Sequence, residues 1–156
     1  MKLSIRKGFS FGLTSGIITT LGLLVGLYSN THSKVVIISG ILVIAVADAM
    51  SDALGIHVSQ ESESNNTEKE VWESTLATFL SKFFIALSFV LPVLIFSLTV
   101  AVIVCVLWGV ILLVIFNYFL AKRKNISPFR VILEHLLIAM VVVVVTYFVG
   151  KWAGKF

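Results

Sequence analysis

Residues 83–120 contain no charged side chain, and no other feature limits the possible folds of this chain so strongly. A membrane-spanning helix needs about twenty apolar residues, so this run is too long for one span. Two helices joined by a tight turn account for it, and we expect the turn around residues 97–99. The whole chain is 58% hydrophobic and 13% charged, whereas a soluble domain carries roughly 25% charged residues. The sequence therefore predicts an integral membrane protein with little mass outside the bilayer.

The other apolar stretches bring the predicted number of spans to five. We predict an all-α membrane protein with a single transmembrane domain over residues 1–156, an acidic cytoplasmic loop at 59–75, and spans at about 9–28, 35–58, 76–96, 100–120 and 131–150. Thr67 and Glu70 have the spacing of a capping box, so a helix should begin there and run into the third span. Pro92 should kink that span, because it leaves the Ser88 carbonyl without a helical partner.

The basic residues predict the orientation of the chain. Three of them fall on one side of the predicted topology, namely Lys34, Lys151 and Lys155, and nine fall on the other side, namely Lys2, Arg6, Lys7, Lys69, Lys82, Lys122, Arg123, Lys124 and Arg130. The positive-inside rule then places the N-terminus in the cytoplasm and the C-terminus outside. Lys82 is expected to snorkel from the start of the third span. Because the charges lie at helix ends rather than on one patch, nucleic acid is not an expected partner.

Two aspartates interrupt the second apolar stretch. Asp48 and Asp52 are four residues apart, so they lie on one face of a helix. An aspartate near the middle of a membrane costs about 2.5–3.5 kcal/mol on insertion scales. The default interpretation of such residues is a pathway or binding site inside the protein. The alternative is a protonated or hydrogen-bonded pair that only fixes helix packing.

The chemistry of this pair suits a cation. Carboxylate oxygens bind hard or borderline divalent ions such as Mn²⁺, Mg²⁺ or Fe²⁺, and a buried carboxylate pair also exchanges protons. Met50 points about half a turn away from Asp52, which argues against thioether ligation. An intramembrane aspartyl protease would need carboxylates facing each other, usually from separate helices. No phosphate-binding loop or nucleophile elbow appears either, so we expect neither an enzyme nor a resident cofactor.

A group of glutamates lies at one mouth of the predicted membrane region. Four of them, Glu61, Glu63, Glu70 and Glu73, are expected to gather cations there by electrostatic attraction. The alternative is that the run is an ordinary solvated helix face.

The first span carries a row of small residues that we call the glycine stripe, formed by Gly8, Gly12, Gly16, Gly22 and Gly26. Spacing of this kind lets another backbone approach closely. Packing within the protomer and a dimer seam both explain it, and we predict a homodimer whose seam includes the stripe.

Several segments together resemble the vacuolar iron transporter (VIT) family, particularly its short prokaryotic members. GLTSGIITTLGLLVGL is similar to the small-residue first helix of that family, and SDALGIHVSQESE to its second-helix signature. Pro92 and the segment TYFVG resemble the third-helix proline and the end of the fifth helix. The resemblance implies a five-helix protomer and a homodimer with the pathway near the subunit interface. It also implies a multi-pass protein of the cell membrane, or of a vacuolar-type membrane in a eukaryote, that exports Fe²⁺ or Mn²⁺ from the cytoplasm in exchange for protons.

The chain departs from the family at the metal ligands. The first-helix aspartate of the family aligns with Ser15, its second-helix glutamate with Ile44, and its pathway methionine with Asp52. The expected metal site is therefore Asp48 and Asp52, with Ser15 as the hydroxyl neighbour, and Mn²⁺ should compete well with Fe²⁺ without the thioether. A non-transporting membrane scaffold or regulator and a metal sensor are the alternative functions.

Overall fold

The computed structural model describes residues 2–156 and is all-α over that range. Six helices follow one another: α1 (Leu3–Thr31), α2 (Lys34–Glu61), α3 (Glu68–Ser88), α4 (Val90–Ile95), α5 (Leu98–Arg123) and α6 (Pro128–Ala153). Because α3 and α4 continue one another, these residues form five segments that are long and apolar enough to cross a membrane. The predicted five-helix membrane fold is confirmed.

Local sequence signals account for where the helices begin. The Ser33 side chain accepts a hydrogen bond from the Val36 amide and caps α2. Thr67 and Glu70 form the predicted capping box, in which each side chain accepts from the backbone amide of the other residue. These caps satisfy amides that a helix start leaves unpaired. Of the predicted acidic loop at 59–75, only residues 62–67 lie between the two helices, and this short connection returns the chain directly to the bundle.

The third span is broken at Phe89, three residues before Pro92. Proline has no amide hydrogen, so the helical hydrogen bond to the Ser88 carbonyl cannot form. Side chains of α5 contact the backbone and side chain at this break. The Cys105 thiol lies 3.6 Å from the Phe89 carbonyl oxygen, and the Trp108 indole nitrogen donates to the Ser88 hydroxyl at 3.1 Å. The predicted kink is confirmed, and α5 supports it.

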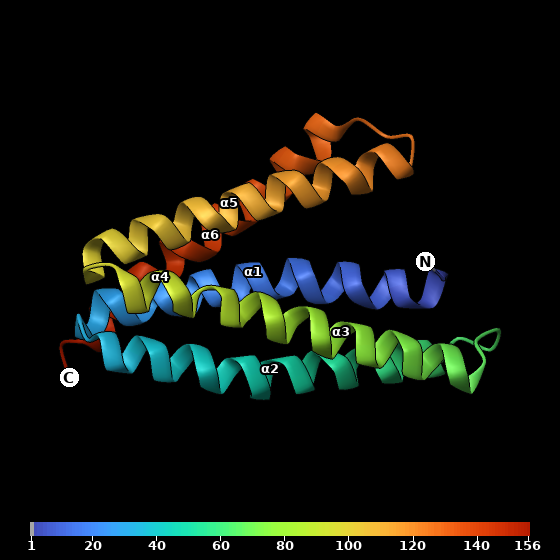
Figure 1. The fold of residues 1–156 in the computed structure, drawn as a ribbon, viewed down its shortest axis with the longest axis horizontal. Helices are drawn as coiled ribbons and strands as arrows, with labels where there is room; N and C mark the ends of the chain where they lie inside the picture. The colour runs from blue at the N-terminus through green and yellow to red at the C-terminus, as the bar shows by residue number, and fades with distance from the viewer. Residues whose placement is uncertain (1) are drawn as a thin grey trace.

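Helix α1 is the centre of the bundle, since it packs against α2, α3, α5 and α6. In Figure 1 the helices α1, α2 and α3 run side by side, α5 is inclined to them, and the two chain termini lie at opposite ends. The apolar core extends to the end of the bundle opposite the N-terminus, where Ile37, Ile41, Phe89 and Val93 are fully buried. Apolar side chains therefore fill that end of the protomer.

The glycine stripe is used inside the protomer. A Cβ on Gly12 would clash with Ser81 and with the Thr78 carbonyl of α3, and a Cβ on Gly22 would lie 2.8 Å from a methyl group of Val142 on α6. The stripe therefore brings α3 and α6 close to the backbone of α1, as small residues do in membrane bundles. The prediction that it forms a dimer seam is wrong, because these faces are already occupied.

Candidate functional site

The candidate site lies at the middle of two neighbouring spans. Asp48 is near the midpoint of the 28-residue α2, and Lys82 is near the midpoint of the 28-residue segment Glu68–Ile95. The Lys82 ammonium nitrogen lies 2.6 Å from Oδ2 of Asp48 and 2.5 Å from Oδ2 of Asp52. The two aspartates share one face of α2, as their spacing predicts, and the opposite charge comes from α3.

Ser15 of α1 completes this cluster. Its hydroxyl donates to Oδ2 of Asp52 at 2.6 Å and accepts a hydrogen bond from the Lys82 ammonium at 3.0 Å. The site residues predicted within the membrane, Ser15, Asp48 and Asp52, therefore lie together. The cluster joins three helices that are distant in sequence through hydrogen bonds and ion pairs.

Lys82 does not snorkel, and that prediction is wrong. The side chain lies inside the bundle, and only 2% of its surface is exposed. Its stem crosses α1 at Gly16, where an added Cβ would lie 3.2 Å from Cγ of Lys82. The missing side chain at Gly16 thus leaves room for the lysine stem to reach the aspartates. An unpaired ammonium in a membrane interior is costly, so the lysine is held by the two carboxylates.

The two carboxylates differ in how well the lysine satisfies them. Asp52 accepts hydrogen bonds from Ser15 and Lys82. The contact with Asp48 has the distance of an ion pair but lacks hydrogen-bond geometry, so Oδ2 of Asp48 is buried without a hydrogen-bond partner. Two carboxylates and one ammonium also leave a formal net charge of −1. The cluster therefore retains both an unsatisfied acceptor and an excess of negative charge.

The face of α2 that carries the aspartates is open in this protomer. The side chains of Asp48 and Asp52 are 31% and 22% exposed. Further along the same face, a Cβ added to Gly55 would meet no atom within 4 Å. Carboxylates in membrane-spanning segments face a water-filled cavity or another protein surface rather than lipid. The open face is thus a place where water, an ion or a second protein chain must be accommodated.

Most of the predicted glutamates at the N-terminal end of the bundle have hydrogen-bond or ion-pair partners. Glu73 accepts from Lys2 at 2.6 Å and from Ser4 at 2.7 Å. Glu70 belongs to the capping box. These two carboxylates fix the start of α3 and its contact with the start of α1.

Glu63 and Glu61 differ from each other in their partners. The Lys7 ammonium lies 3.3 Å from Glu63, and its hydrogen bond, followed by that of Asn66, holds the pKa of Glu63 below the ordinary value. Glu61 is exposed and has no side-chain partner within residues 2–156. Over the same range no three His, Cys, Asp or Glu side chains are placed to hold a metal ion.

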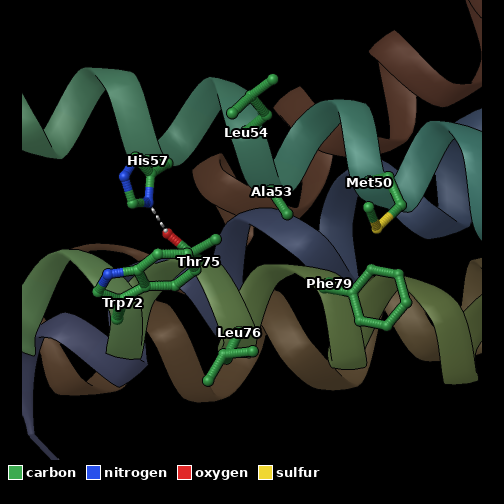
Figure 2. A pocket seen from close by; sticks show the side chains of 8 residues that line it. All are labelled: Met50, Ala53, Leu54, His57, Trp72, Thr75, Leu76 and Phe79. Carbon is green, nitrogen blue, oxygen red and sulfur yellow. Dashed lines mark hydrogen bonds between the residues drawn. The ribbon is translucent and has the colours of Figure 1, made fainter.

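Met50 lies away from the cluster, as its direction on α2 predicts. It lines an outward-facing apolar groove of about 430 Å³ between α2 and α3, and the other lining residues are Ala53, Leu54, His57, Trp72, Thr75, Leu76 and Phe79. Figure 2 shows Met50 at one end of this groove and the hydrogen bond between His57 and Thr75 at the other. The buried residues Ala49 and Ala53 separate the groove from the aspartate face. The Met50 thioether therefore points into the groove and away from the two aspartates.

Comparison with known families places this geometry in context. Residues 7–71 match the model of the VIT family, and this segment contains most of α1, all of α2 and the start of α3. The match covers less than half of the chain, and over that segment it supports a relationship to the VIT family. A member of that family would be a metal ion transporter. No curated protein matches the chain significantly.

The VIT match includes Ser15, Asp48 and Asp52 but ends before Lys82. Sequence reasoning missed this lysine because it set the start of the third span at residue 76. The capping box at Thr67 contained the necessary signal. Counting a full-length span from Glu68 puts Lys82 in the middle of the membrane, where a charge needs a partner.

Proposed function

We propose that this protein is a secondary transporter of the VIT type that moves divalent metal ions, Fe²⁺ or Mn²⁺, out of the cytoplasm in exchange for protons. The observation that carries the proposal is the pair of carboxylates at the midpoint of α2, in contact with a third polar group from α1. Transporters commonly hold their substrate near the middle of the bilayer. Asp48, Asp52 and Ser15 are the proposed ligands.

The ligand set favours a hard or borderline ion. Asp48 and Asp52 supply carboxylate oxygens and Ser15 supplies a hydroxyl oxygen, while the thioether of Met50 lies in the outward groove. Oxygen ligands suit Mn²⁺ and Fe²⁺ without the preference for softer ions that sulfur gives. Mn²⁺ should therefore compete well with Fe²⁺ for transport.

Protons are the proposed counter-ions. Asp48 and Asp52 are the titratable side chains of the proposed ligand set. A metal ion binds only deprotonated ligands, so its arrival releases protons and its departure allows them to return. Exchange of the metal ion for protons keeps the net charge of the site inside the membrane small.

A homodimer is proposed to cover the open face of α2. Asp48 and Asp52 are partly exposed at the level of the membrane interior, and a second copy would exclude lipid from them. Gly55 lies on the same face in open space, so Gly55→Leu should weaken dimerisation without disturbing the protomer. A variant that remains dimeric in detergent would show that the dimer uses another surface.

The mouth of the pathway is proposed to lie at the end of the bundle that carries the glutamates. Glu61, Glu63, Glu70 and Glu73 would raise the local concentration of cations there. Glu61 and Glu63 are exposed to solvent, so this attraction should weaken as salt is added.

Flux into proteoliposomes tests the proposal. Wild-type protein should move Mn²⁺ and Fe²⁺ when a pH gradient is applied, and the reverse metal gradient should move protons. Asp48→Asn and Asp52→Asn keep size and polarity but remove the titratable oxygen, so each should lose flux driven by the pH gradient. Lys151→Met at the end of α6 is the matched control for a charge change away from the site. Wild-type flux in both aspartate variants would refute the proposed pathway.

A structural role is the second candidate function, and one observation favours it. Lys82 already holds both carboxylates, as a locking ion pair in a membrane scaffold or regulator would. The flux assay separates the two functions, because a scaffold moves no metal under any gradient. A metal sensor would bind Mn²⁺ in detergent but fail the same assay.

A further inference from the structure

The Lys82 ammonium occupies the position where a cation bound to the two aspartates would sit. It lies within 2.6 Å of an oxygen of each carboxylate and is also hydrogen-bonded to Ser15. These are the same three groups proposed as metal ligands. A divalent ion in contact with Asp48 and Asp52 would therefore have to share its position with a fixed positive charge.

The two cations exclude each other on electrostatic grounds. Lysine carries a compact point charge, and like charges at contact distance repel strongly in a poorly polarisable interior. With the ammonium alone the cluster has a formal charge of −1, whereas both cations together would bring it to +1. A divalent ion that replaces the ammonium leaves the cluster neutral, which costs less in the membrane interior than either charged arrangement.

The site is built so that the lysine can hold this position and also leave it. Gly16 leaves space for the stem, and four rotatable carbon–carbon bonds let the ammonium move while the helix stays in place. The lysine does not satisfy both carboxylates, because Oδ2 of Asp48 is buried without a hydrogen-bond partner. The carboxylates are also open to the outside of the protomer. An ion can thus approach the carboxylates from the open face of α2 while Lys82 contacts them from inside the bundle.

We propose that Lys82 is a tethered competitor for the transported ion: it fills the empty site, and a divalent metal binds to Asp48 and Asp52 only when the ammonium has moved away. This inference rests on the proposed function, in which the aspartates bind metal. Lys82 then sets the affinity for the metal ion, since the apparent dissociation constant of the metal rises as the fraction of unblocked sites falls. It also keeps the carboxylate pair from remaining uncompensated after the metal has left.

The test measures Mn²⁺ binding to purified wild-type protein and variants in detergent. Lys82→Met keeps the stem but removes the charge, so its dissociation constant for Mn²⁺ should fall about tenfold if roughly a tenth of wild-type sites are unblocked. Lys82→Gln should behave in the same way. Lys151→Met should bind as the wild type does. A merely structural lysine would not give tighter binding when removed, so equal or weaker binding in both Lys82 variants overturns the inference.

A second measurement uses the unaltered chain, in case the variants fold poorly. An amine-reactive reagent followed by mass spectrometry reports how accessible Lys82 is. Labelling of Lys82 should increase when saturating Mn²⁺ displaces the ammonium, while labelling of Lys151 stays constant. Unchanged labelling of Lys82 at saturating Mn²⁺ counts against displacement.

The outcomes also separate this inference from the proposed function. If wild-type protein binds Mn²⁺ through Asp48 and Asp52 and the Lys82 variants bind no better, the competitor is refuted and the metal site stands. If the Lys82 variants bind Mn²⁺ far more tightly than wild type, and Asp52→Asn abolishes that binding, both are supported. If neither wild type nor any Lys82 variant binds Mn²⁺, both the site and the competitor are refuted.

Discussion

The Lys82 ammonium of α3 lies 2.5 Å from the Asp52 carboxylate of α2, and both residues belong to the middle of membrane-crossing segments. Neither charge could be placed there alone without a large desolvation cost. Their pairing therefore fixes how α2 and α3 are aligned. It also means that any change at this cluster alters the stability of the bundle as well as its chemistry.

The two aspartates should differ in their effect on stability. Asp52 accepts two hydrogen bonds, whereas Asp48 makes only an ion-pair contact. Hydrogen bonds to charged groups contribute about 1.5–3 kcal/mol, so we expect Asp52→Asn to lower the free energy of unfolding by about 2 kcal/mol and Asp48→Asn to lower it less. Thermal unfolding in detergent measures both. Equal losses would show that the lysine holds the two carboxylates equally well.

The contact of α1 with α3 should be sensitive to a single methyl group. Gly12→Ala places a Cβ against the Thr78 carbonyl and Ser81, and overpacking of this kind costs about 1–3 kcal/mol. Gly55→Ala is the matched control, since the space around it is open and alanine in a helix is favoured over glycine by about 0.5–1 kcal/mol. Thermal unfolding should therefore separate the two variants in opposite directions. A Gly12→Ala variant as stable as wild type would mean that α3 can withdraw without loss.

Much of the fold could be predicted because the signals are local. The uncharged run at residues 83–120 required two helices, and the capping box of Thr67 and Glu70 set the start of α3. The spacing of Asp48 and Asp52 alone placed both on one face of α2. Each of these inferences depends on residues within one helix or one turn.

The errors concern contacts between helices. The glycine stripe fits a dimer seam and internal packing equally well, because spacing does not say which helix fills the groove. The capping box at Thr67 could have placed Lys82 at the middle of the third span, but its pairing with the aspartates could not be predicted, for the same reason. Lys82 lies 30 residues after Asp52, and only the assembled bundle brings the two together.

The break at Phe89 should matter more for transport than for binding. Pro92→Ala restores an amide hydrogen that can bond to the Ser88 carbonyl, so α3 and α4 should become more continuous. The Cα positions of Asp48, Asp52 and Lys82 lie outside this break, so Mn²⁺ affinity should change less than about twofold. Flux should fall, because the apolar end of the bundle must open for an ion to leave and a straight helix resists that bending. Flux at the wild-type rate would show that the break has no role in opening.

The glutamates at the mouth should not contribute equally. Lys7 compensates the charge of Glu63, whereas Glu61 is exposed and uncompensated. Glu61→Gln should therefore raise the apparent KM for Mn²⁺ at low ionic strength more than Glu63→Gln does, with little change in the maximal rate. Added salt should remove the difference by screening. If neither substitution changes the KM, the glutamates are a solvated helix surface and play no part in gathering ions.

The final prediction concerns the orientation of the chain. Lys82 lies inside the bundle and must be removed from the basic residues counted at the membrane surface, and eight remain on the side of the N-terminus against three on the other. This asymmetry still favours a cytoplasmic N-terminus. In intact cells, a membrane-impermeant thiol reagent should therefore label Phe156→Cys and leave Ser64→Cys unlabelled. The native Cys105 is fully buried and should not react. External labelling of Ser64→Cys would reverse the topology and place the glutamates outside the cytoplasm.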